Sequence, residues 1–576
     1  MTKKSITRSF FVALAALSFY GAQAEDYSPA IEHIGDRYII HVENLELNGE
    51  ESLLDVLMMC PDLMSLNGTS TLPSGTPNLG YYALRVNNID INTDTEIFLK
   101  NTKASELKTI KVVVNPGIQK GSGGLKKVID LNFRTGENGT HGKVAVEGDT
   151  KASGEVFGRV ITKTDRAWVM GQVAGKLAYT KHAHEAVENA NVNVNLDLTS
   201  KDNLQLQASQ VFNREREDGE AAAYDRLVSL TACYTRSLSD NGAYAMLQIA
   251  GDYTTGDKCG TQPTCSRSTS PYGVIEFGFP FFHKNTYVTA GIETGYSAAT
   301  SNSYDEYIKT LRRYTDSERY EDFYAQVDWS NGQWGVSVGD RFRVRNFWLA
   351  QRASSDAWEH TTTNNYATAT VWCNINPHHT IQVLGARRFY GVGYDQMRLT
   401  SEAPSPEFVK EFFTKSVYTN PIYIAEARYT YQRSNFNIMA LVKNEHQNLS
   451  ALEKDNILTT GVSAFIHAGV FRMTVGVNYM WEQCQVKPEK DNFHWVSLHF
   501  APQLSLKKEW RITANAVYNS RRANEGFSIY REPNFYLDVA VSKKFNKHWL
   551  VEAKFHDIVD QVVGTRGASL GATYFF

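Results

Sequence analysis

The carboxyl-terminal stretch Leu570-Gly571-Ala572-Thr573-Tyr574-Phe575-Phe576 decides the fold class. Apolar side chains recur there at every second position, and the sequence stops on the aromatic residue Phe576. A period of two places successive side chains on opposite faces of an extended strand. The stretch therefore predicts a final β-strand with one continuous apolar face.

The same alternation runs through most of the chain. One clear example is 192–198, where Val192, Val194, Leu196 and Leu198 interleave with asparagine and aspartate. Between Gly142 and Phe576 we count about 22 such segments, each with one face suited to lipid and one to a wet or plugged lumen. A soluble β-sandwich would have a few strands per domain with Greek-key connections. The uninterrupted run instead favours a 22-stranded antiparallel transmembrane β-barrel.

The lengths of the connections support this prediction. Every second connection is short, as at 165–166, 331–332 and 468–469, whereas most others are longer, as at 181–191, 256–271 and 391–421. Outer-membrane barrels have short periplasmic turns and longer outer loops. We therefore expect the first barrel strand to rise from the periplasm and the carboxyl terminus to return to it.

The amino terminus has the pattern of a secretory signal peptide over residues 1–24. Lys3, Lys4 and Arg8 precede an apolar run from Phe10 to Leu17, and Ala22-Gln23-Ala24 precedes Glu25. This order of a basic region, a short apolar region and small residues predicts cleavage between Ala24 and Glu25. No later run of about 18 apolar residues predicts a transmembrane helix.

Charge and cysteine content narrow the function. The net charge of −3 argues against a nucleic-acid partner. Six cysteines in 576 residues do not make a disulfide scaffold. Cys259 and Cys265 lie close together in a predicted outer loop, so a local disulfide between them is as plausible as two free thiols.

A barrel of about 22 strands has a lumen too wide for side chains alone to close. The segment 25–140 is the candidate to fill it as a small α+β plug. We expect a short helix at 51–59 that Pro61 ends, two short strands within 82–91, a strand at 107–114, a glycine-rich loop at 117–124 and a strand at 127–133.

This order of elements, together with the barrel pattern, resembles the TonB-dependent outer-membrane receptors. Pro61, Arg85 and the glycine-rich loop match the family's plug pattern, while Asp62 stands where glycine is usual. The resemblance implies a plug over 25–140, a barrel over 141–576, an outer-membrane location and contact with its lipid. The final strand, which ends in Phe576, resembles the signal read by the barrel-assembly machinery.

The resemblance also implies a function. Such a receptor takes up a ligand past its plug, driven by the TonB energy-coupling complex, and siderophore, haem, cobalamin, glycan and peptide all remain open as ligands. Residues 25–36 contain no match to the family's TonB-contacting segment, which favours a non-transporting surface-binding or structural protein as the alternative. A passive hatch-gated channel is a further alternative, but that class has about 14 strands.

We find no catalytic motif, which predicts a protein that is not an enzyme, and no cofactor site. Residues 121–124 lack the spacing of a nucleotide-binding loop. His182, His184 and Glu185 could hold a metal ion, but a solvated loop is the favoured interpretation. Glu552 and Lys554 face the predicted lumen, where they could line a path or contact the plug.

The longest predicted outer loop, 391–421, contains the start of a helix. Ser405 can cap it, Pro406 suits its first turn, and Phe408 and Phe412 lie one turn apart, followed by Phe413. An aromatic helix in an outer loop needs a surface to pack on. We expect it to fold onto the barrel rim or, alternatively, to form a lid over the plug or a dock for a surface lipoprotein.

Overall fold

The computed structural model describes eight short stretches before residue 138 and most of the chain after it. The stretches are 31–34, 37–45, 52–57, 82–86, 89–90, 98–99, 101–113 and 127–133. From 138 to 576 the gaps are 151–152, 180–182, 218–221, 259–263, 282–284, 306–309, 352–356, 390–420, 434–435, 449–452, 487–488, 507–508, 521, 524–529, 532, 547 and 560–565. Every structural statement below concerns these described residues.

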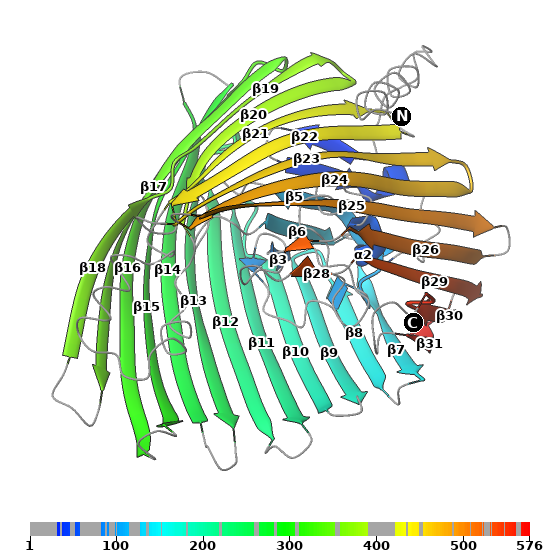
Figure 1. Ribbon diagram of the computed structural model, residues 1–576, viewed down its shortest axis with the longest axis horizontal. Coiled ribbons are helices and arrows are strands. Elements are labelled where there is room, and N and C mark those ends of the chain that lie inside the picture. Colours follow the sequence, from blue (N-terminus) through cyan, green and yellow to red (C-terminus); the bar gives the residue numbers. More distant parts are fainter. Residues whose placement is uncertain are drawn as a thin grey trace.

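A closed antiparallel β-barrel makes up the larger part of the molecule (Figure 1). Its segments are β7 (Gly139–Asp149), β8 (Gly154–Lys163), β9 (Ala167–Tyr179), β10 (Ala183–Asp197), β11 (Asp202–Glu217), β12 (Ala223–Ser237), β13 (Tyr244–Lys258), β14 (Thr264–Pro280), β15 (Thr286–Asp305), β16 (Thr310–Ser330), β17 (Trp334–Gln351), β18 (Ala357–Asn365), β19 (Thr368–Asn376), β20 (His379–Arg388), β21 (Ile422–Gln432), β22 (Phe436–Asn448), β23 (Glu453–Ala468), β24 (Phe471–Val486), β25 (Glu489–Leu506), β26 (Trp510–Asn519), β29 (Asn534–Phe545), β30 (Trp549–His556) and β31 (Gly567–Phe575). A two-stranded hairpin, β27 (Arg522–Ala523) and β28 (Tyr530–Arg531), lies in the connection before β29.

Two of these segments form a single barrel strand. Both β18 and β19 pair with β17 in one continuous register, β18 with its outer half and β19 with its inner half. The backbone N–H of Tyr366, in the two-residue gap between them, still donates to the carbonyl of Arg341 at 2.8 Å. The 23 segments therefore make 22 strands, which confirms the predicted barrel.

The barrel closes where its last strand meets its first. β31 pairs with β7, and the backbones of Phe576 and Gly142 exchange two hydrogen bonds of 2.9 Å. A Cβ at position 142 would lie 2.4 Å from the Phe576 ring, so only glycine leaves room for this aromatic side chain. Leu570, Tyr574 and Phe576 are exposed on the outer face, as the alternation predicted.

Several strands are longer than the apolar pattern indicated. β10 begins at Ala183, inside the predicted loop 181–191, and β13 and β14 occupy most of the predicted loop 256–271. β16 is 21 residues long. Above the membrane both faces of a strand are wet, so hydrophobic alternation fades while the backbone hydrogen bonds continue.

The amino-terminal part forms a six-stranded mixed sheet in the order β1-β2-β5-β6-β3-β4. The elements are β1 (Ile31–Ile34), β2 (Arg37–His41), η1 (Val42–Leu45), α2 (Leu53–Leu57), β3 (Tyr82–Val86), β4 (Ile89–Asp90), η2 (Ala104–Glu106), β5 (Leu107–Val113) and β6 (Lys127–Phe133). The helix and four of these strands lie where the sequence predicted them. Strands β1 and β2, which are short and carry polar residues, were not predicted from the sequence.

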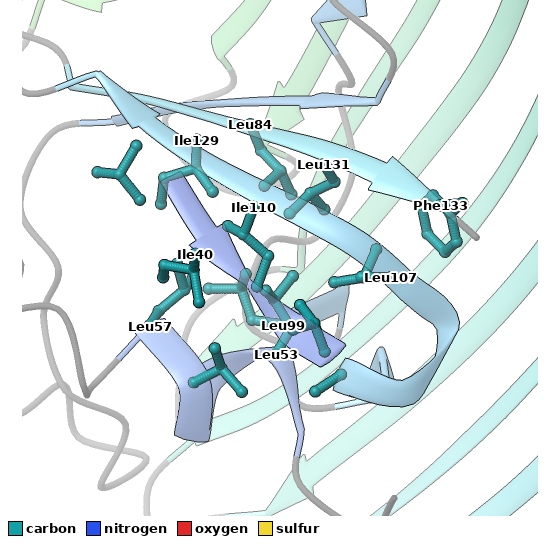
Figure 2. Packing of buried hydrophobic residues seen from close by; sticks show 14 of the residues in the cluster. Ile40, Leu53, Leu57, Leu84, Leu99, Leu107, Ile110, Ile129, Leu131 and Phe133 are labelled. Atoms are coloured by element: carbon teal, nitrogen blue, oxygen red, sulfur yellow. The ribbon is translucent and has the colours of Figure 1, made fainter. Parts of the chain in front are cut away.

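The core of this sheet is a compact apolar cluster. Ile40, Leu53, Leu57, Ile110 and Ile129 are fully buried and point toward one another from strands and helix (Figure 2). The sheet lies inside the barrel (Figure 1), so it is the plug. Among the described residues, no helix is long and apolar enough to cross a membrane.

Candidate functional site

The contact between the plug and the barrel wall is the candidate functional site, because any path through the lumen must open there. At its centre Glu106, the last residue of η2, lies between Lys143 of β7 and Arg159 of β8. Its carboxylate accepts from the Lys143 ammonium and, at 2.5 Å, from Arg159 Nη1. We call these three residues the plug clamp.

Neighbouring groups complete the plug clamp. Arg159 Nη2 also donates to Thr102 Oγ1 of the plug at 2.7 Å and to Gln172 Oε1 of β9 at 2.9 Å. Lys143 donates to the backbone carbonyl of Asn101. The Arg159 guanidinium lies 5.2 Å from the ring centroid of Phe98 in the plug, within cation–π distance. Arg159 of the barrel thus contacts a carboxylate, a hydroxyl and an aromatic ring of the plug.

The electrostatics of the plug clamp favour an ionised Glu106. Burial on its own would raise the pKa of this carboxyl, but Lys143 and Arg159 outweigh burial and hold the pKa below its usual range. The plug therefore contributes the negative charge that two buried barrel cations require. Removing it would leave both cations in a poorly hydrated place.

Apolar and weaker polar contacts hold the plug on both sides of the plug clamp. Phe133 of β6 packs against Trp168 of β9, with ring centroids 5.6 Å apart. On the other side, the Tyr38 hydroxyl of β2 contacts Met439 Sδ of β22 at 2.9 Å and accepts from Arg428 Nη1 of β21 at 3.3 Å. We call β7–β9 with β21–β23 the plug-facing wall.

A second group of buried charges lies on strands β13–β17, which we call the paired wall. Asp322 of β16 accepts from Arg341 Nε at 2.7 Å and from Arg343 Nε at 2.6 Å, both on β17. Arg341 also donates to Glu293 Oε2 of β15 at 2.6 Å. Glu276 of β14 accepts from the hydroxyls of two tyrosines, on β13 and β16. These partners all come from neighbouring strands of the same wall.

Tyrosine rings on the paired wall lie flat on glycines of the next strand. Gly295 pairs with Tyr320, and a Cβ on it would lie 2.3 Å from that ring. Gly291 pairs with Tyr324, where the distance would be 2.4 Å. Because glycine has no side chain, each ring can lie directly against the backbone of the neighbouring strand. The tyrosine hydroxyls are thereby directed along the wall to Glu293 and Glu276.

The structure describes only part of the residues that the sequence singled out. Ala24, Glu25, Cys259, Phe408, Phe412 and Phe413 lie outside the described residues, so the cleavage site, the disulfide and the aromatic loop helix stay predictions. Cys265 is in β14, where its backbone pairs with Asp257 of β13. Glu552 and Lys554 form an ion pair of 2.9 Å. Within the described part of the chain, no three potential ligands are placed to hold a metal ion.

The sequence analysis did not identify the charged residues that form the buried ion pairs of the plug-facing wall and the paired wall. The stretch Arg341-Phe342-Arg343-Val344-Arg345 alternates arginine with apolar residues, and that signal would have found the lumenal arginine row. Glu106 gives no comparable signal. It lies in a plain polar segment, and its partners are 37 and 53 positions away in the chain.

Comparisons with known proteins agree with this architecture. Residues 405–573 match the outer membrane protein beta-barrel family. The fold is similar to the siderophore receptor PiuA from Acinetobacter baumannii, with TM-score 0.69, 10% identity, and 96% of this chain and 99% of that chain covered. It is also similar to the ferric citrate transporter FecA in the unliganded form, with TM-score 0.70, 12% identity and coverage of 95% and 98%. The copper transporter OprC gives TM-score 0.68, 8% identity and coverage of 96% and 100%.

No curated protein matches the sequence. The chain is an outer-membrane β-barrel protein with the plug-and-barrel fold of the TonB-dependent receptors. The predicted fold class and location are therefore confirmed.

Proposed function

We propose that this protein is a TonB-dependent transporter that carries a ligand past its plug and is not an enzyme. The observation that carries the proposal is the plug clamp, which fixes a separate plug to one wall of a 22-stranded barrel by few polar contacts. Breaking it would remove the ion pairs that join the plug to β7 and β8. An energy source that pulls on the plug would supply the free energy needed to separate these charges.

The proposal extends to domains and partners. Residues 1–24 are the signal peptide, 25–140 the plug and 141–576 the barrel. The partners are outer-membrane lipid, the TonB energy-coupling complex in the inner membrane, the barrel-assembly machinery at the Phe576 end and, through Phe408 and Phe412, a surface lipoprotein. Structural neighbours are named as receptors or transporters of siderophores, ferric citrate and copper, so chelated metal ions are the first ligands to test.

Uptake measurements test this function directly. Radiolabelled ferric siderophores and copper complexes would be offered to cells that express the protein, with and without a working TonB complex. Transport predicts accumulation that needs both the protein and the complex. Surface binding of a ligand without accumulation in either strain would contradict transport.

A reversible tether sharpens the test. In a variant without native cysteines, Asn101→Cys in the plug and Glu155→Cys in β8 replace two hydrogen-bonded side chains. A short bis-methanethiosulfonate cross-linker would join plug and wall, and a reductant would release them. We expect uptake to stop on cross-linking and to recover on reduction, while each single variant stays active. Uptake that continues with the tether closed would exclude detachment at this wall.

The non-transporting surface protein is the second candidate, favoured by the lack of a recognisable TonB-contacting segment in residues 25–36. It predicts ligand binding that is independent of the TonB complex. The passive hatch-gated channel is not supported, because the barrel has 22 strands rather than about 14.

A further inference from the structure

Four arginines lie together near the outer ends of strands β11, β12 and β14. They are Arg214 and Arg216 of β11, Arg226 of β12 and Arg267 of β14, and we call them the arginine patch. All four side chains are exposed. None of the four takes part in the plug contacts or in the buried charge pairs of the paired wall described above.

The alternation of the strands places the arginine patch on the outside of the barrel. On β12, Leu230 is 61% exposed on the lipid face, and Arg226 lies four residues along the same strand. On β11, Leu206 is also exposed and Arg214 lies eight residues along. Even spacings in strands with unbroken registers keep side chains on one face. Arg267 shares the outer face of β14 with exposed Ile275 by the same argument.

The height of the arginine patch follows from β12. Arg226 and Arg236 bracket four outward positions, occupied by Val228, Leu230, Ala232 and Tyr234. Ten residues at about 3.4 Å each, on a strand tilted by about 40°, rise roughly 25 Å, which is the height of the apolar band. Arg236 therefore lies at the periplasmic edge of the band and Arg226 at its outer edge.

The lateral spacing joins the arginines into one surface. Arg226 pairs with Thr255 of β13, and Thr255 pairs with Arg267 of β14. Neighbouring strands are about 4.8 Å apart, so the two arginine backbones are separated by about 10 Å. Arg214 pairs with Tyr224, two residues from Arg226.

The patch carries excess positive charge. Arg226 Nη2 donates to Gln210 Oε1 at 3.0 Å, and the Arg214 guanidinium lies 5.6 Å from the Tyr224 ring centroid. Within the described chain none of the four arginines forms an ion pair, whereas the outward-facing Arg319 of β16 pairs with Glu321 at 2.5 Å. Two exposed carboxylates share the face, Glu188 of β10 and Asp257 of β13, which leaves a formal charge of +2 from four arginines and two acids.

We propose that the arginine patch binds the phosphate groups of a phosphorylated glycolipid in the outer leaflet. Guanidinium groups bind phosphate through paired hydrogen bonds, and their charge is complementary to it. The outward residues directly below, among them Phe212, Val228 and Tyr253, are apolar or aromatic and suit the acyl chains of the same molecule. A ligand with phosphates above and hydrocarbon below fits this surface, and a free phosphate would leave the lower part unused.

Native mass spectrometry of the intact barrel tests the proposal. The protein would be reconstituted with bisphosphorylated lipid A, released into mild detergent and weighed with its retained lipid. The test variant combines Arg214→Gln, Arg226→Gln and Arg267→Gln. The matched control is Arg319→Gln, which removes an outward arginine that is already paired. A second triple variant with lysine at the three positions keeps the charge.

Each basic residue near a membrane surface contributes about a fivefold gain in affinity for anionic lipid, so three give about 100-fold. We expect wild type, Arg319→Gln and the lysine variant to retain lipid A, and the glutamine variant to lose it. Dephosphorylated lipid A should be retained no better by wild type than by the glutamine variant. Equal retention of the bisphosphorylated lipid by wild type and glutamine variant, or its release by millimolar inorganic phosphate alone, would overturn the proposal. If the triple variant fails to assemble, Arg226→Gln alone, with an expected fivefold loss, decides the question.

Discussion

The plug-facing wall and the paired wall satisfy buried charge in different ways. On β7 and β8 the cations Lys143 and Arg159 depend on Glu106 of the plug. On β15–β17 Arg341 and Arg343 have Asp322 and a glutamate of the wall itself as partners. A buried charge whose partner lies on another domain loses that partner when the domains separate, which costs free energy. A buried charge whose partner lies in the same sheet keeps it. Separation of the plug from the plug-facing wall would therefore cost free energy. The charge pairs of the paired wall would stay intact and keep the barrel rigid.

Both walls depend on closure of the barrel. A change that prevents closure should therefore have the largest effect on the amount of folded protein. Deletion of residues 574–576 removes the last pairs of β31 with β7, including the two Phe576–Gly142 hydrogen bonds. We expect nearly complete loss of folded barrel from the outer membrane, measured by heat-modifiable mobility in membrane fractions. Phe576→Tyr, which keeps an aromatic end, is the control. Normal levels of the truncated barrel would contradict the role assigned to this seam.

The two walls should respond differently to loss of one carboxylate. Asp322→Asn removes the carboxylate that the buried Arg341 and Arg343 share and leaves Arg341 with Glu293, and we expect a loss of about 3–5 kcal/mol in barrel stability. Glu106→Gln removes the charge of the plug clamp, but Lys143 and Arg159 face the lumen and water can reach them once the plug is held less firmly, so the stability of the barrel should change less than in Asp322→Asn. Glu106→Gln should instead raise conductance in planar bilayers, because the plug is held less firmly.

Thermal unfolding followed by tryptophan fluorescence and single-channel recording would separate these effects. The comparison between the walls is wrong if Glu106→Gln destabilises the barrel as much as Asp322→Asn does.

Substitution of a glycine that lies under a tyrosine ring should have a smaller effect on the stability of the barrel. Gly295→Ala would place a Cβ 2.3 Å from the Tyr320 ring, so the ring must move and its hydrogen bond to Glu293 weakens. We expect a loss of about 1–3 kcal/mol. Gly171→Ala on β9 is the matched control, because a Cβ there has no neighbour within 4 Å. Equal denaturant midpoints for the two variants would exclude a role for ring packing.

Acidification should weaken the plug-facing wall by a smaller amount. The pKa of Glu106 is lowered in the clamped state from its usual 4.5, so its carboxylate charge contributes fully above that pH. Its contribution falls as the pH drops through the lowered pKa, because protonation removes the charge. We expect conductance of wild type to rise at low pH while Glu106→Gln changes little. A parallel rise in both would assign the pH effect to other groups.

The sequence predicted the barrel better than its functional contacts. Alternation in strands such as 192–198, and the apolar end of β31, is a local signal that repeats 22 times, so errors at single boundaries do not change the count. The plug helix and strands β3 to β6 were likewise found from local pattern and order. The ends of β10, β13 and β14 were not, because their outer parts lack an apolar face.

The sequence by itself predicted that the chain is exported, and it determined that the strands have one lipid-facing side and that a separate segment fills the lumen. These properties depend on side-chain period and composition, which are local. Only the tertiary structure decided that Glu106 meets Lys143 and Arg159, that Asp322 meets Arg341 and Arg343, and that the arginine patch gathers on three strands. Such contacts depend on strand register and on how the plug sits in the barrel, and register is fixed by the closure of the whole sheet.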